Sequence, residues 1–246
     1  MNNLFYQILF PVLSAHLLGD FILQTDKDVK NKANGFVFAK HVLIVTLLSY
    51  LLTGVWNSWI LLFTVLFSHT IIDFIKRILG KDSLRIFLLD QLMHIIIAIL
   101  LALYLQNILT AANISETFWF NYFGVDYLKL LVLLMAVLLI TKISGIVISY
   151  IIKPYQIKTQ TNPKEEIKNG RIIGYLERLI ILVLFLSDLS SIIGFLIAAK
   201  SILRYSEIKN EKDKAMLEYV LIGTLLSFTI GIVIAAVTNK VLNSFA

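Results

Sequence analysis

Residues 86–109 read IFLLDQLMHIIIAILLALYLQNIL. An apolar stretch of this length matches the ~20 residues that a helix needs to cross the hydrocarbon core of a bilayer. Similar stretches recur along the chain, so that 58% of its 246 residues are apolar and only 15% are charged. Soluble domains are roughly half apolar and a quarter charged. The composition excludes a soluble globular domain and predicts an all-α, polytopic transmembrane helical bundle.

Six stretches are long enough to be read as spans with little ambiguity. The first carries His16 and Asp20 and has no basic segment before it, which favours a retained span over a signal peptide. The six predicted spans are residues 4–23, 41–55, 59–75, 86–109, 126–152 and 215–237.

Residues 172–205 are harder to assign, because about 50 Å of helix is too long for one span and short for two. Basic residues gather in the segments 24–40, 76–85 and 153–171, while the turns between them carry none. This alternation is the positive-inside pattern and predicts an N-terminus outside the cell. A single crossing by 172–205 would break the pattern, because it would place four more basic residues outside: Arg204, Lys209, Lys212 and Lys214.

A helical hairpin broken near residues 187–191 keeps these charges in the cytoplasm. It is either re-entrant or just spanning, and it brings the total to seven to eight membrane segments. We expect two domains, residues 1–109 with four helices and residues 126–242 with the hairpin. The expected location is the cell (plasma) membrane. A net charge of +6 is then explained by cytoplasmic Lys and Arg beside anionic lipid head groups, and no nucleic-acid partner is needed.

All four histidines fall in the first hundred residues, and three of them have an aspartate four positions away. Residues four apart share one face of a helix. Ionisable groups inside spans are costly and usually point into the bundle or a wet cavity. The three pairs are His16 with Asp20, His69 with Asp73, and His94 with Asp90.

The predicted topology places these pairs and His41 at one depth, near the inner leaflet. With no cysteine in the chain, a metal site must use nitrogen and oxygen ligands, and this set supplies both. We therefore expect a site for a divalent metal (Zn, Mn or Fe), supported by the polar side chains of Gln24 and Gln91. His41 is its least supported member, because no carboxylate lies one turn away. The alternatives are a proton relay, structural ion pairs and interhelical hydrogen bonds. The candidate ligands are His16, Asp20, His41, His69, Asp73, Asp90 and His94.

Lys142 lies deep in the fifth span, where a charge needs a partner. Asp188, at the predicted break of the hairpin, is the nearest candidate of opposite charge. We expect an intramembrane charge pair between Lys142 and Asp188.

Four motifs stand out in the first half of the chain: residues 16–26 (HLLGDFILQTD), 40–41 (KH), 68–73 (SHTIID) and 87–94 (FLLDQLMH). Together with their spacing, these motifs resemble the DUF3307 family of bacterial integral membrane proteins, a domain of unknown function. The similarity covers about residues 8–105, and the second half resembles the tail of longer members. The resemblance implies no established activity.

The hypothesis for function is a metal-dependent membrane hydrolase that acts on a lipid-linked or cytoplasmic phosphate or ester. Asp20, Asp73 and Asp90 are its candidate catalytic carboxylates, as ligands or general bases. Two alternatives stay open: a proton- or cation-coupled transporter, and a non-catalytic membrane scaffold. The outer halves of the first four spans are almost wholly apolar, which favours a site open to one side over a transport path.

Overall fold

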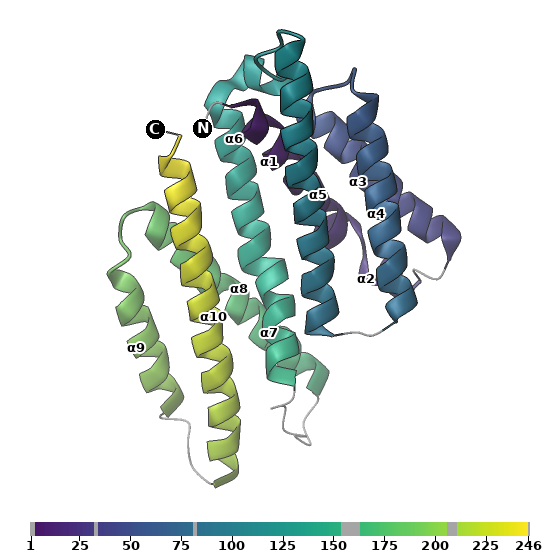
Figure 1. Ribbon diagram of the computed structural model, residues 1–246. Coiled ribbons are helices and arrows are strands. Elements are labelled where there is room, and N and C mark those ends of the chain that lie inside the picture. The colour runs from purple at the N-terminus through teal and green to yellow at the C-terminus, as the bar shows by residue number, and fades with distance from the viewer. Residues whose placement is uncertain (1–2, 32–33, 81–82, 154–162, 206–210, 246) are drawn as a thin grey trace. The chain divides into compact units, whose positions relative to one another are not determined.

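The computed structural model describes residues 3–31, 34–80, 83–153, 163–205 and 211–245, and throughout these ranges the regular structure is helical (Figure 1). Six helical stretches there are long and apolar enough to cross a membrane, which confirms a polytopic helical bundle and indicates a multi-pass membrane protein. They are α1 with its continuation η1 (Leu4–Leu23), α3 (Gly35–Thr53), α4 (Trp59–Leu79), α5 (Leu84–Ala111), α6 (Phe118–Leu138) continued to Ile152 by η2 and α7, and Leu221–Asn243 of α10.

The chain forms two compact units, and the division falls inside α6. Unit 1 is Met1–Met135 with Ser244–Ala246, and unit 2 is Ala136–Asn243. The predicted division lay earlier, in the linker 110–125. The start of α6 belongs to unit 1 because its side chains bond to the end of α3. The Trp119 indole donates to the carbonyl of Leu51 at 2.7 Å, and the Tyr127 hydroxyl donates to that of Leu52.

Helix ends in unit 1 follow ordinary capping chemistry. The Asn34 side chain accepts from the amide of Phe36 at 2.9 Å and begins α3, while Ser58 and Ser83 begin α4 and α5 in the same way. Gly54 and Gly80 end α3 and α4 in the left-handed conformation that glycine adopts without strain. These caps fix where each span stops. The short α2 (Asp26–Lys30) starts at a capping box and lies in the first loop.

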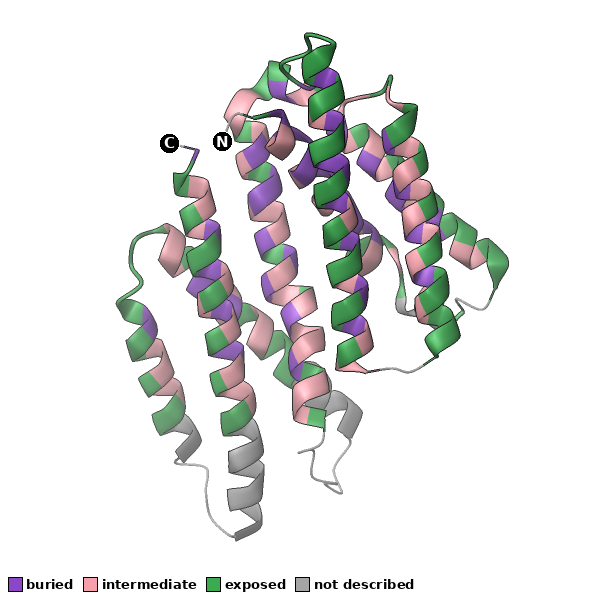
Figure 2. Ribbon diagram, viewed as in Figure 1, coloured by how far each residue is buried: buried purple, intermediate pink, exposed green. Residues whose placement is uncertain are grey.

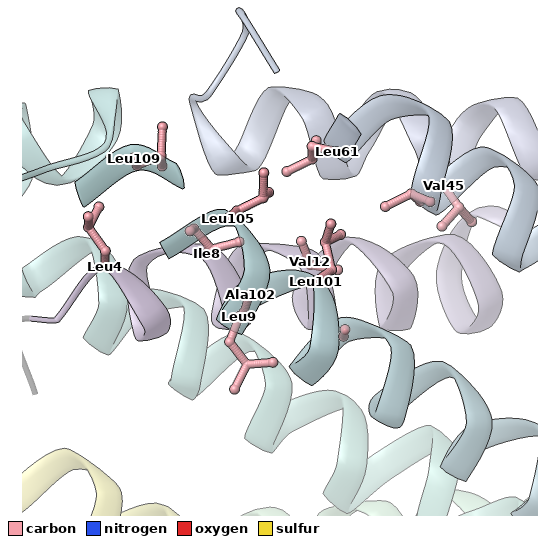
Figure 3. Packing of buried hydrophobic residues seen from close by; sticks show 12 residues of the cluster. Leu4, Ile8, Leu9, Val12, Val45, Leu61, Leu101, Ala102, Leu105 and Leu109 are labelled. Carbon is pink, nitrogen blue, oxygen red and sulfur yellow. The ribbon is translucent and has the colours of Figure 1, made fainter. Parts of the chain in front are cut away.

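The helix α1 is the most buried of the six candidate spans and packs against α3 and α5. The bundle closes through contacts between α3 and α4 and between α4 and α5, which run side by side in Figure 1. Figure 3 shows the apolar core that these helices share. It is made of side chains such as Leu4, Ile8, Leu61, Leu101 and Leu105. The core fills the end of unit 1 nearest the start of α1.

The outer faces of α4 and α5 are exposed and apolar, as the green positions in Figure 2 show. On α4 the exposed stripe is Phe63, Phe67 and Ile71, which recur every four residues. Large contiguous apolar surface of this kind is rare on soluble monomers. It fits lipid contact.

Unit 2 contains the predicted hairpin, formed by α8 (Pro163–Leu186) and α9 (Ile192–Tyr205) with α10 (Glu211–Asn243) against both. The two helices are separated at 187–191, where Asp188 has φ of +58°. Helix α8 begins earlier than the predicted residue 172, because Pro163 suits the first helical position. Arg204, Lys209, Lys212 and Lys214, on which the predicted hairpin topology depended, lie outside the residues whose side chains are described.

A wide helical turn in the fifth span is paired with a buried arginine. The turn η2 (Leu139–Ile143) is π-helical, so its carbonyls lack their ordinary partners. The Arg178 side chain of α8 donates through Nε to the carbonyl of Ile140 at 2.6 Å and through Nη1 to the Ser227 hydroxyl of α10 at 2.5 Å. One side chain therefore joins η2, α8 and α10.

We expect Arg178→Ala to destabilise unit 2 by about 2–3 kcal/mol, because it removes two charge-assisted hydrogen bonds from a buried site. The loss of stability is measured by unfolding the detergent-solubilised chain with increasing fractions of SDS. Far-ultraviolet circular dichroism follows the loss of helix. Arg171→Ala on the exposed face of the same helix is the matched control. Equal stability of the two variants would show that the Arg178 contacts contribute nothing.

Candidate metal centre

The histidine and aspartate side chains lie at one end of the buried helix faces of unit 1. On α4 the buried stripe is Leu61, Val65, His69 and Asp73, so one face changes from apolar to ionisable along its length. On α5 the order is reversed: after Phe87 come Asp90 and His94, and the buried positions that follow, such as Ala98, are apolar. Antiparallel neighbours with these patterns bring their polar ends together.

A π-helical turn positions Asp20. The turn η1 (Gly19–Leu23) ends where the amide of Gln24 donates to the carbonyl of Gly19 at 3.0 Å. Gly19 itself lies against α3, since a Cβ atom there would stand 2.4 Å from Cγ2 of Val45. Because the backbone at Gly19 lies so close to α3, the carboxylate of the next residue, Asp20, lies beside His41 of that helix. Wide turns of this kind are frequent at functional sites.

Three side chains from three helices form a compact triangle of ligand atoms. Nε2 of His41 is 3.0 Å from Nε2 of His69 and 3.3 Å from Oδ1 of Asp20, and the His69 to Asp20 distance is 3.6 Å. A tetrahedral zinc site with bonds of about 2.0–2.1 Å has ligand atoms about 3.3 Å apart. The triangle therefore has the dimensions of one face of such a site.

Asp73 adds a fourth ligand atom, an oxygen, to this triangle. Its Oδ2 lies 3.4 Å from Nε2 of His41 and 4.0 Å from Nε2 of His69. We name Asp20, His41, His69 and Asp73 the first ligand set. Its side chains are almost completely buried, with side-chain exposures of 8% for Asp20 and 4% or less for the others.

Asp90 and His94 lie beside the first ligand set on α5. Nδ1 of His94 donates to the carbonyl of Asp90 at 2.8 Å, which leaves Nε2 with its lone pair. That Nε2 is buried and has no hydrogen bond within the described part of the chain. Asp90 Oδ2 accepts from Lys76 Nζ at 2.5 Å and from the Gln91 amide at 3.0 Å, while its Oδ1 has no hydrogen bond there.

His16 is orientated by the same glutamine. Its Nε2 lies 3.3 Å from Oε1 of Gln91, so Nδ1 carries the lone pair, and that atom is 3.8 Å from Oδ1 of Asp20. The ring stacks on His94 with centroids 4.3 Å apart, and the His69 ring lies 4.5 Å from that of His94. All four imidazoles thus form one contiguous group.

A small cavity adjoins three of these rings. His16, His69 and His94 line one end of it, and apolar side chains such as Val12, Val45 and Leu101 line the rest. It has room for roughly two water molecules, and the imidazoles and nearby serine hydroxyls offer the polar partners that water needs. Water in this cavity would contact the three histidines.

The cluster gathers three acidic side chains in a buried setting. Asp20, Asp73 and Asp90 are acidic, and Lys76 contacts Asp90. Carboxylates in a low-dielectric interior are stabilised by nearby positive charge, which Lys76, protonated imidazoles or a metal ion can supply. Three groups of ligand atoms lie close enough to hold an ion: His16, His69, His94; Asp20, His41, His69; and Asp73, Asp90, His94.

The cluster brings together all seven histidine and aspartate residues that the sequence pattern singles out. His41, for which no carboxylate lies one turn away, contacts Asp20, His69 and Asp73. Its carboxylate partner comes from α1 and not from its own helix. Lys76 was missed as a cluster residue, although it lies three positions after Asp73 on the same helix face.

The remaining predicted residues lie apart from these contacts. Gln24 lines a small pocket with His41 and Lys40, on the loop side of the cluster. Lys142 and Asp188 are both exposed, and the ion pairs of the described residues include none between them. A polar side chain that does bond to the fifth span is Arg178, through the carbonyl of Ile140.

Comparison with known proteins gives a family and nothing more specific. The model of a protein family of unknown function, DUF3307, matches residues 8–125. No curated protein and no solved structure matches the chain. The matched residues include every side chain of the histidine and aspartate cluster. The expected resemblance is confirmed over residues 8–125, the part of the chain that builds the candidate metal centre.

Proposed function

We propose that the first ligand set binds a divalent metal ion and that the chain is a metal-dependent hydrolase of the cell membrane. The substrate is a phosphate or ester, either lipid-linked or cytoplasmic. The observation that carries the proposal is the triangle of Asp20, His41 and His69, whose edges of 3.0–3.6 Å match a tetrahedral site. Its imidazole and carboxylate donors suit Zn, Mn or Fe.

The surroundings of the site support hydrolysis. A divalent cation in this position would polarise a phosphoryl or carbonyl oxygen and acidify water. The cavity at His16, His69 and His94 offers room for that water. Asp20, Asp73 and Asp90 supply carboxylates within the cluster that can accept its proton.

The setting in the membrane follows the charge pattern of the sequence. We place the N-terminus outside and the cluster near the inner leaflet, with the basic loops against anionic lipid head groups. The exposed apolar faces of α4 and α5 contact the bilayer. A substrate of the membrane surface would then approach the site from the cytoplasmic side.

The transporter alternative has weaker support from the geometry. The buried hydroxyls of α3 do not form an open polar path: Thr46, Ser49 and Thr53 each donate to the carbonyl four residues earlier in their own helix. The apolar core of unit 1, which includes Val45 and Leu61, packs around this region. The site is therefore better described as open to one side.

Metal analysis of the purified chain tests the proposal. We expect the detergent-solubilised protein to retain at least one equivalent of Zn, Mn or Fe, measured by elemental analysis after dialysis. The double variant His41→Gln, His69→Gln is expected to lose that ion, because it removes two ligand atoms while it roughly preserves side-chain volume.

The control is Tyr127→Phe, which breaks a hydrogen bond to α3 in the same unit without touching the cluster. It should keep the metal. Absence of metal from the wild-type chain after exposure to each of the three ions would overturn the proposal, and so would equal metal content in the wild type and the double variant.

A further inference from the structure

We infer that the centre holds two metal ions, which share Asp73. The inference rests on the proposed function, since it adds a second ion to the first ligand set. The second ion would be bound by Asp73, Asp90 and His94, whose ligand atoms lie within 4.8 Å of one another. This second ligand set shares Asp73 with the first ligand set, but it includes none of the three residues of the triangle, Asp20, His41 and His69.

His94 carries the strongest mark of a ligand in the second set. Its Nδ1 donates to the carbonyl of Asp90, an arrangement that fixes the ring and leaves Nε2 as the donor atom. That Nε2 is buried without a hydrogen bond in the described residues, and His94 is only 7% exposed. Buried polar atoms are almost always hydrogen-bonded, so an orphaned lone pair indicates a missing partner.

Asp90 shows a similar division between its two oxygens. Oδ2 is held by Lys76 and by the amide of Gln91, at 2.5 and 3.0 Å. Oδ1 is buried with no hydrogen bond and lies 3.7 Å from Nδ1 of His94. One oxygen is therefore orientated by protein donors, while the other is left for a cation.

Asp73 links the two sets. Its Oδ2 is 3.4 Å from His41 in the first set, and its carboxylate also belongs to the second. A carboxylate has two oxygens, and bundle proteins with two-metal sites use such groups from facing helices. Asp73 comes from α4, whose neighbours α3 and α5 supply His41 to the first set and His94 to the second.

A two-ion centre also narrows the substrate class. Two divalent cations against three carboxylates and one lysine leave an excess of positive charge. That excess favours an anionic substrate, and paired metals clamp the attacking and leaving oxygens of a phosphate ester. A phosphate ester is therefore the class that this centre would hydrolyse.

The test uses Mn²⁺ alone as the probe on the full chain in detergent. We expect about two Mn²⁺ per chain at saturation, and an electron paramagnetic resonance spectrum with the exchange splitting of a coupled Mn²⁺ pair. His94→Gln is expected to bind about one Mn²⁺ and to give an uncoupled spectrum. Thr53→Ala, a buried substitution at the opposite end of α3 from His41, should behave as the wild type.

The wild-type spectrum does not depend on the folding of any variant. One uncoupled Mn²⁺ per chain in the wild type would overturn the two-ion inference and leave the single-ion proposal standing. No bound Mn²⁺, Zn²⁺ or Fe²⁺ would overturn both. Two ions that stay fully bound in His94→Gln would also overturn the assignment of the second set.

Discussion

Asp73→Asn is expected to lower the affinity for divalent metal by at least ~100-fold. Mutation of a residue that only hydrogen-bonds to a metal ligand already lowers metal affinity by about 10–100-fold, and Asp73 is itself a proposed ligand. Asp73 is 2% exposed and contacts His41 in the first ligand set. Asparagine keeps the shape of the side chain and removes its negative charge. Because the carboxylate also belongs to the second ligand set, the substitution should weaken both ions at once.

The measurement is a titration of the metal-free chain with Mn²⁺ in detergent, in which the concentration of unbound Mn²⁺ is recorded at each step. Asp126→Asn is the matched control, because the same change falls on a side chain of unit 1 that is 88% exposed. It should leave the titration unchanged. Equal affinities in the two variants would mean that Asp73 is not a ligand.

Lys76→Met is expected to lower the stability of the metal-free chain and to raise its affinity for metal. Lys76 neutralises Asp90 through a 2.5 Å contact, and its side chain is 32% exposed. Without metal, the variant leaves a buried carboxylate unpaired, and we expect a loss of about 2 kcal/mol, below the 3–5 kcal/mol of fully buried pairs. With metal, the removal of a nearby positive charge should raise Mn²⁺ affinity by roughly tenfold.

Stability in SDS, with and without saturating Mn²⁺, shows both effects. Lys129→Met serves as control, because that lysine forms an exposed pair with Asp126. Metal should restore more stability to Lys76→Met than to the wild type. If the apo variant is as stable as the wild type and binds Mn²⁺ no better, Lys76 is not part of the electrostatics of the centre.

The spans could be predicted from the sequence because membrane crossing depends on length and apolar content. The first predicted span, 4–23, coincides with α1 and η1. The pairs His16–Asp20, His69–Asp73 and His94–Asp90 could also be predicted, since residues four apart on a helix are neighbours whatever surrounds them. All three pairs lie within the same cluster.

Contacts between helices were beyond a reading of one sequence. The role of His41 depends on Asp20, which reaches it through a π-helical turn and the close contact of Gly19 with Val45. The partner of the fifth span was missed for a similar reason. A wide turn at Leu139–Ile143 exposes a carbonyl, and no apolar pattern reveals that Arg178 will bond to it.

The central claim is that imidazoles of the first four spans hold a metal ion, and X-ray absorption at the zinc edge tests it most directly. On the zinc-loaded chain in detergent, we predict nitrogen and oxygen ligands at about 2.0–2.1 Å and the outer-shell scattering of at least two imidazole rings. A shell of oxygen ligands without imidazole scattering would contradict the claim.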